Sequence, residues 1–556
     1  MTITASKPFS FERIAFAAIA AFTLAPVFLH TWWQLISLAI GGTGDPYKLT
    51  LASLVVTAGS IVAYIVFNKQ KLLSSVILSS LIGLGIALLL GKNFLSILSM
   101  ALVFFFLSLF ISTLITWLIA RLPLDLEGSA KQHKIRTAVF ILLAVFTIGQ
   151  TARVSTFMGD AKRADLSVFP FISFLDTHSC LTAYVHALKL AETDVENLYD
   201  VVHWPTDKEQ YTGSAKELVK TGPYAPFFLD AYVYPPQFLL LPTIILALSD
   251  NFFVQRAIWF GFSALCLMIG FWIVANWVGE KNKGSALLLI PLLWSNSVIL
   301  SVLQIGNIHH VIIVIVILAM IAFEQKKPVL GGALLAFSIV SKVSPGIFGI
   351  ILLVQRRWRD AASTFTFGII FTMLSIMFFG TQSLESFLIY ELPRLRSGEA
   401  MGWLVNPHEI LTNYSLFSLP FKLLLIGFQF DDVWGIARTL GNLYTLFILG
   451  LTVFIALQPQ RDRYQKICLW LSVLTLATLQ SPFAPGYVTM PLFWMLTLMA
   501  NKIKNATGVV ALVFIWIALS LYPPLATGSM AVIIGLFQQI VIFGFIAFIL
   551  FPKPLI

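Results

Sequence analysis

Residues 72–90, LLSSVILSSLIGLGIALLL, and residues 95–119, LSILSMALVFFFLSLFISTLITWLI, are consecutive apolar runs without a charged side chain. A helix needs about 20 apolar residues to cross the hydrocarbon core of a bilayer, so each run predicts one membrane-spanning helix. The whole chain has the same character: 58% of its 556 residues are hydrophobic and 11% are charged. A soluble chain carries about 25% charged residues. This composition excludes a soluble globular protein and predicts an all-α polytopic membrane protein.

Further apolar runs predict about 15 membrane-spanning helices in all. The expected spans lie near residues 12–31, 49–67, 72–90, 95–119, 136–152, 254–278, 284–302, 306–323, 329–354, 361–380, 434–457, 467–481, 486–500, 507–523 and 528–550. The run 329–354 contains Lys342 and Pro345 near its middle, which makes it a candidate for two half-helices. The runs 236–249 and 415–429 are too short to span and are candidates for re-entrant or interfacial segments.

The distribution of lysine and arginine predicts the orientation of the chain. If the N-terminus is cytoplasmic and 329–354 crosses twice, every cytoplasmic loop is basic, as the positive-inside rule requires. These loops are 68–71, 120–136, 279–284, 324–328, 355–360, 458–466 and 501–505. They account for the net charge of +10, so we expect no nucleic-acid partner. Both termini are then cytoplasmic, and 153–235 and 381–432 form the two large outer loops.

The first outer loop is expected to bear surface helices. One stretch of it places apolar residues at helical spacing, which predicts a helix lying along the membrane surface. Its apolar positions are Leu181, Tyr184, Val185, Leu188 and Ala191. We divide the chain into an N-terminal four-helix transmembrane module, 1–135, and a larger transmembrane unit, 136–556.

Asp176 is the first candidate for chemistry. An ionisable group at the membrane edge costs about 2.5–3.5 kcal/mol on insertion scales, which makes it a candidate functional residue. Asp176 follows the apolar stretch SVFPFISFL, and desolvation there would raise its pKa, as suits a general base. The alternative is an N-cap, because Asp-Thr-His-Ser precedes a helical stretch. Asp160 and Asp165 remain alternative bases.

Polar residues also interrupt the apolar sequence further along. Tyr234 precedes two prolines that end the first outer loop, where structural punctuation is the default interpretation. The stretch QIGNIHHVII places Asn307, His309 and His310 at the expected outer end of a span. Contact with a polar ligand and a polar contact between helices are equally open for these residues. We expect no metal site, because adjacent histidines on a helix point about 100° apart and the three cysteines show no metal-binding spacing.

Three basic residues are expected on the outer side, where the orientation rule does not place cations. They are Lys342, Arg394 and Arg396. Cations near polar groups suggest a phosphate ligand. The alternative for each is a snorkelling or loop-surface charge.

From about residue 136 onward, the order of these motifs resembles glycosyltransferase family 87, a family of GT-C-type enzymes that use polyprenyl-phosphate sugars. The resemblance rests on Asp176 and on VYPPQ (233–237), IGNIHH (305–310), GGALLAFSIVSKVSP (331–345), QRRWRD (355–360), NYSLFSLP (413–420) and QSPFAP (480–485). The chain departs from the family at Asn307, where the family has a glutamine. It also lacks the Trp and paired histidines that many members carry after Ser481-Pro482.

The resemblance implies a GT-C-type glycosyltransferase fold and an inverting transfer of mannose or a related sugar. The donor would be a polyprenyl-phosphate sugar and the acceptor a lipid or glycan, at the outer face of a bacterial plasma membrane, without cofactor or metal. Asp176 would be the catalytic base, and the three basic residues would bind the donor phosphate. Substrate-binding residues would be Tyr234, Asn307, His309, His310 and Asn413. The rival interpretations are a lipid-linked-sugar flippase or secondary transporter, and a non-catalytic GT-C relative.

Overall fold

The computed structural model describes most of the chain. The described residues are 11–67, 71–122, 134–170, 172–193, 195–204, 222–279, 290–401, 404, 406–458, 462–500, 502–503, 506–523, 526 and 528–551. All regular secondary structure within them is helical, which confirms the predicted all-α class. Parts of the basic loops that predict the orientation, such as 123–133 and 280–289, lie outside the described residues.

The chain folds into two compact units. The first contains residues 1–176, 248–265 and 279–295, and the second contains residues 177–247, 266–278 and 296–556. Helix α12 (Phe252–Gly279) contributes residues to both. The predicted module 1–135 falls within the first unit, and its separate role stays a prediction.

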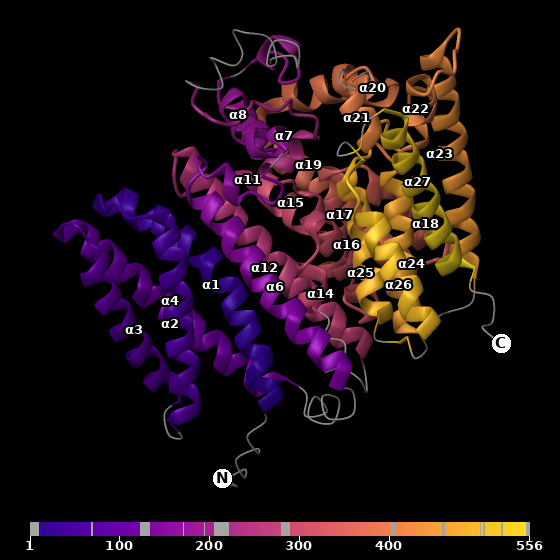
Figure 1. The fold of residues 1–556 in the computed structure, drawn as a ribbon. Helices are drawn as coiled ribbons and strands as arrows, with labels where there is room; N and C mark the ends of the chain where they lie inside the picture. The colour runs from indigo at the N-terminus through magenta and orange to yellow at the C-terminus, as the bar shows by residue number, and fades with distance from the viewer. Residues whose placement is uncertain are drawn as a thin grey trace. The chain divides into compact units, whose positions relative to one another are not determined.

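The first unit is built on long helices that begin the chain (Figure 1). They are α1 (Phe11–Ile40), α2 (Pro46–Val66), α3 (Lys71–Leu90), α4 (Phe94–Arg121) and α6 (Lys134–Gly159). Helix α2 begins where the Asp45 side chain accepts hydrogen bonds from the backbone N–H groups of Tyr47 and Lys48. Asn93 caps α4 in the same way. These caps satisfy backbone donors that the first helical turn leaves unpaired.

Helix α3 packs closely on α4 through small residues. Its buried residues are Ser75, Ser79, Gly83 and Ala87, spaced four apart along one face. A Cβ added at Gly83 would lie 2.5 Å from the Cβ of Phe104 on α4. Because lipid is as apolar as a leucine side chain, helices in a bilayer associate by such close approach of backbones.

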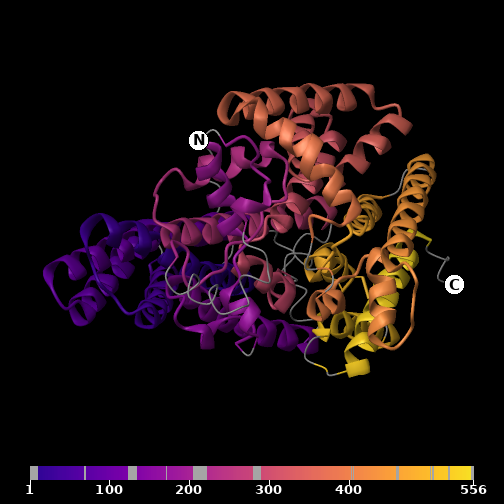
Figure 2. The same ribbon diagram turned by 90° about the horizontal axis from the view of Figure 1, so that it is seen from above.

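The second unit holds most of the later helices. They are α8 (Leu181–Ala191), α11 (Leu240–Leu246), α15 (Ser297–Ile305), α16 (His309–Glu324), α17 (Pro328–Ser341), α18 (Ile347–Val354), α19 (Trp358–Ser386), α20 (Leu392–Ser397), α21 (Pro407–Thr412), α22 (Leu419–Leu425), α23 (Val433–Leu457), α24 (Arg463–Thr478), α25 (Met490–Ala500), α26 (Ala506–Ser520) and α27 (Gly528–Leu550). Helices α23 and α27, orange and yellow, run side by side (Figures 1 and 2), and the rings of Tyr444 and Phe543 meet between them. Helix α8 confirms the helix predicted over residues 181–191.

Nine helices in the described part of the chain are long and apolar enough to cross a membrane, so this is an integral membrane protein. They cover Arg13–Ile40, Pro46–Val66, Lys71–Leu90, Phe94–Arg121, Ala138–Gly159, Phe252–Gly279, Trp358–Ser397, Val433–Leu457 and Gly528–Leu550. The other apolar helices described are shorter or bent. The predicted number of about 15 spans is therefore not confirmed.

A sharp bend separates α15 from α16, and it places the polar motif. The two helices meet at 108° across residues 306–308. Gly306 ends α15 with φ of +74°, a left-handed conformation that glycine adopts without a Cβ clash. The histidines predicted at the end of a span therefore begin α16 at an interior corner of the fold.

A second break divides the run 329–354, as expected for two half-helices. Helix α17 ends at Ser341, Lys342 is extended (φ −153°, ψ 107°), and α18 begins at Ile347. Because the backbone of Lys342 is extended, its side chain points in a direction that differs from the one it would have in a continuous helix.

Candidate functional site

The corner between α15 and α16 presents buried polar groups. Asn307, His309 and His310 are all nearly inaccessible. The side-chain oxygen of Asn307 accepts a hydrogen bond from the backbone N–H of His309 at 2.9 Å. The Nδ1 of His310 donates to the backbone carbonyl of Asn307 at 3.0 Å, because a carbonyl can only accept. The second contact fixes the direction of the His310 imidazole ring.

Lys342 meets this corner from the break after α17. Its Nζ donates to Nδ1 of His309 at 3.1 Å and lies 4.8 Å from the ring centre of Tyr487 and 5.9 Å from that of Tyr234. The rings of His309 and Tyr487 are 4.9 Å apart. We call Lys342, His309, Tyr234 and Tyr487 the lysine–histidine cluster.

The lysine–histidine cluster is rich in hydrogen-bond donors. An ammonium has no acceptor, so Nδ1 of His309 must accept and Nε2 must carry the ring proton. Nε2 of His309 is buried and has no hydrogen-bond partner within the described residues. In the same part of the chain, no carboxylate forms an ion pair with Lys342. A part-buried cation beside an unpaired N–H group is suited to bind an anion.

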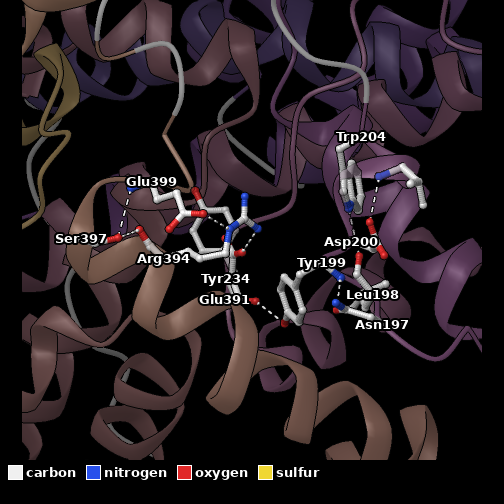
Figure 3. Close-up of polar contacts among 11 residues, drawn as sticks. Asn197, Leu198, Tyr199, Asp200, Trp204, Tyr234, Glu391, Arg394, Ser397 and Glu399 are labelled. Carbon is white, nitrogen blue, oxygen red and sulfur yellow. Dashed lines mark hydrogen bonds and ion pairs between the residues drawn. The ribbon is translucent and has the colours of Figure 1, made fainter.

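Tyr234 is held by the residues around the two prolines. Its backbone carbonyl accepts a hydrogen bond from the hydroxyl of Tyr199 at 2.8 Å (Figure 3). The hydroxyl of Tyr232 donates to the carbonyl of Pro235 at 2.9 Å. The ring of Tyr234 packs edge-on against that of Tyr184, with centres 5.6 Å apart. The prolines therefore act as structural punctuation, and they also aim a tyrosine at the lysine–histidine cluster.

Arg394 lies beside two neighbouring carboxyl groups (Figure 3). Its Nη1 lies 3.2 Å from Oε2 of Glu391, which is only 3% exposed, and its Nε lies 3.7 Å from Glu399. Arg396 is exposed. Among the described residues, no hydrogen bond or ion pair joins either arginine to the lysine–histidine cluster. The phosphate-binding role of both arginines stays a prediction. Of the three predicted cations, Lys342 is the one that contacts His309 at the corner between α15 and α16.

Asn413 joins two distant turns of the chain. Its side-chain nitrogen donates to the carbonyl of Pro482 at 2.7 Å, and its side-chain oxygen accepts from the N–H groups of Ser415 and Ala484 at 3.1 and 2.9 Å. The buried Lys422 donates to the Asn413 carbonyl at 2.6 Å. Both ends of the amide are thus occupied by backbone, which gives Asn413 a structural role, and its substrate-binding role stays a prediction.

Asp176 belongs to the first unit, in the short helix α7 (Ser173–Thr177). Burial raises its pKa above the usual range, and the Ser167 hydroxyl partly offsets this. Its Oδ1 is buried without a hydrogen-bond partner in the described structure. The N-cap alternative is wrong for α8, because Cys180 occupies that position and no side chain caps the helix. Asp176 therefore has the local properties expected of a base.

The two alternative acids have other roles in their surroundings. The exposed Asp165 binds Arg163 at 2.9 Å, and the hydrogen bond from this guanidinium lowers the pKa of Asp165. Asp160 accepts a hydrogen bond from the backbone N–H of Lys162 at 3.0 Å, closing a turn. A lowered pKa makes a carboxylate a weaker proton acceptor, so Asp165 is less suited to act as a base than Asp176.

Sequence reasoning missed one group of residues in the second unit. Nδ1 of His178 lies 3.2 Å from Oδ1 of Asp230, and Nε2 of His178 lies 3.5 Å from Sγ of Cys180. Asn307 donates to the same sulfur at 3.4 Å. Burial lowers the pKa of His178, but Asp230 and Cys180 outweigh burial and raise it well above the usual value. The His-x-Cys spacing was visible in the sequence, but Asp230 lies fifty residues away and nothing in its neighbourhood marked it.

Comparison with known families agrees with the order of the motifs. The sequence profile described as glycosyltransferase family 87 matches residues 232–482. This range includes Tyr234, the corner between α15 and α16, Lys342 and Asn413, and it ends at Pro482. No curated protein and no solved structure matches the chain.

Proposed function

We propose that this integral membrane protein is a glycosyltransferase that takes its sugar from a polyprenyl-phosphate donor. The match of residues 232–482 to the profile of glycosyltransferase family 87 supports the reaction class. The transfer is inverting and delivers mannose or a related sugar to a lipid or glycan acceptor. It takes place at the outer face of a bacterial plasma membrane, with both termini of the chain in the cytoplasm.

The lysine–histidine cluster is the observation that carries this proposal. The leaving group of such a donor is a lipid phosphate, which gains negative charge as the glycosyl bond breaks and needs charge stabilisation rather than a proton. Lys342 supplies a part-buried positive charge, and Nε2 of His309 supplies a buried donor without a partner in the described structure. We assign both residues to the donor phosphate, and Tyr234 and Asn307 to the walls around it.

Asp176 is proposed as the base on its local properties alone. The acceptor hydroxyl attacks the anomeric carbon, the bond from that carbon to the phosphate oxygen breaks, and the hydroxyl proton passes to the carboxylate. The phosphate leaves with the bonding electron pair. A carboxylate with a raised pKa and an unpaired buried oxygen is a better proton acceptor than an ordinary surface aspartate.

Two substitutions test the assigned roles. Lys342→Met should lower kcat by about 10²–10³, the usual cost of removing one charge-stabilising group, and Lys342→Arg should retain part of the activity. Lys502→Met, which changes an exposed lysine, is the matched control and should be fully active. Asp176→Asn should abolish transfer while leaving expression intact. Full activity of Lys342→Met would refute the phosphate site, and full activity of Asp176→Asn would refute the base.

Product analysis tests the donor class. Purified protein is supplied with a panel of polyprenyl-phosphate sugars and, separately, with nucleotide sugars. Glycosylated acceptor together with free polyprenyl phosphate is expected only from the first group. A flippase or transporter would leave the glycosyl–phosphate bond intact, and transfer from nucleotide sugars would contradict the proposed donor.

A further inference from the structure

Three potential metal ligands converge in the second unit. They are His178, Cys180 and Asp230, each part-buried, and one ligand atom from each lies within 4.8 Å of those from the other two. The Sγ of Cys180 and Nε2 of His178 are already 3.5 Å apart. Ligand atoms around a tetrahedral zinc ion, at bond lengths of about 2.0–2.3 Å, are separated by roughly 3–4 Å. Nδ1 of His178 faces Asp230 and Nε2 faces Cys180, so a shared ion would bind one ring nitrogen and the ligand beside the other nitrogen would rotate toward it.

The backbone around these ligands is held in place from several sides. The Thr182 hydroxyl donates to the carbonyl of Phe228 at 2.9 Å and accepts from the N–H of Asp230 at 3.1 Å, which joins the segment of Asp230 to α8. The N–H of Cys180 donates to the carbonyl of Ile305 at 2.8 Å. A metal site needs this kind of support, because ligands must be positioned before the ion arrives.

The three ligand types indicate which ion fits. A thiolate and an imidazole together favour zinc over magnesium or calcium, which prefer oxygen ligands. One thiolate and one carboxylate balance the charge of a divalent ion. Three protein ligands leave a fourth position for water or a substrate oxygen, as in catalytic zinc sites.

We propose that His178, Cys180 and Asp230 form a binding site for a divalent zinc-type cation with one open coordination position. One ring nitrogen of His178, the thiolate of Cys180 and the carboxylate of Asp230 are its three ligands. Asn307, which contacts Cys180 at 3.4 Å, connects this site to the corner between α15 and α16. This proposal does not depend on the proposed glycosyl transfer, because metal binding is measured directly and needs neither donor nor acceptor.

The first experiment is a titration of the purified full-length protein, in detergent and stripped with a chelator, with Co²⁺. We expect one equivalent to bind with a sulfur-to-cobalt charge-transfer band that Zn²⁺ abolishes by displacement. Cys180→Ser should eliminate the band, and the matched control Cys266→Ser, which changes a cysteine on α12, should leave it unchanged. Absence of binding, or a band that survives Cys180→Ser, would overturn the proposal.

The second experiment separates a metal site from a reactive thiol. Asp230→Asn removes one of the three ligands and should weaken Zn²⁺ binding by at least the roughly 10–100-fold that loss of an outer-shell partner costs, and it should keep the sulfur-to-cobalt band. The same geometry also fits a thiol activated by a histidine and an aspartate. If the protein binds no metal but iodoacetamide alkylates Cys180 rapidly, and His178→Ala slows that reaction, the site is a nucleophilic thiol and the metal assignment is wrong.

Discussion

The structure assigns Asn413 a structural role that can be measured as stability. Its amide oxygen is the acceptor for the backbone N–H groups of Ser415 and Ala484. Asn413→Ala leaves both donors buried without this acceptor. Each unsatisfied buried donor costs about 1–3 kcal/mol, so we expect a loss of about 2–6 kcal/mol in the free energy of unfolding. The carbonyl of Pro482 adds little to this cost, because the Ser415 hydroxyl still donates to it at 2.8 Å.

The assay is unfolding by sodium dodecyl sulfate in mixed micelles, followed by loss of helical circular dichroism. Asn406→Ala is the matched control, because Asn406 only caps α21 with one hydrogen bond to the N–H of His408 and its loss costs about 1 kcal/mol. The reasoning is refuted if Asn413→Ala is no less stable than Asn406→Ala. If Asn413→Ala is no less stable than Asn406→Ala but has lost glycosyl transfer, Asn413 binds substrate instead of supporting the fold.

Three further predictions concern packing, support and pH. Gly83→Ala should destabilise the protein by about 1–3 kcal/mol through overpacking against α4, whereas Gly85→Ala, whose Cβ meets nothing within 4 Å, should not; equal stability of the two would contradict close packing of α3. Thr182→Val leaves the N–H of Asp230 without its acceptor and should cost about 1–3 kcal/mol in the unfolding assay; an unchanged midpoint would contradict this support. A general base must be ionised, and burial raises the pKa of Asp176. Log kcat/KM should therefore fall with decreasing pH at an apparent pKa above that of an ordinary aspartate, about 3.9. An apparent pKa at or below that value would argue against Asp176 as the base.

The fold class and the resemblance to a glycosyltransferase family followed from local sequence patterns. Apolar runs such as 72–90 predict helices because lipid requires each span to satisfy its own backbone, and α3 follows its run closely. The break at Lys342 was also visible, since Pro345 cannot continue the hydrogen bonding of a helix interior. The number of spans was less accessible, because an apolar run does not reveal whether its helix continues, bends or stops short.

Only the tertiary structure decided which polar residues meet. The bend of 108° after Ile305 puts His309 beside Lys342, and no periodicity encodes that angle. The pairing of Arg394 with Glu391, by contrast, is local, because Glu391 lies three residues before it in the chain. The sequence by itself determined that this is a helical membrane protein whose residues 232–482 match a glycosyltransferase family profile, because hydropathy and motif order are properties of the chain. The meeting of Lys342 with His309 depends on contact between distant segments, which exists only once the helices have packed.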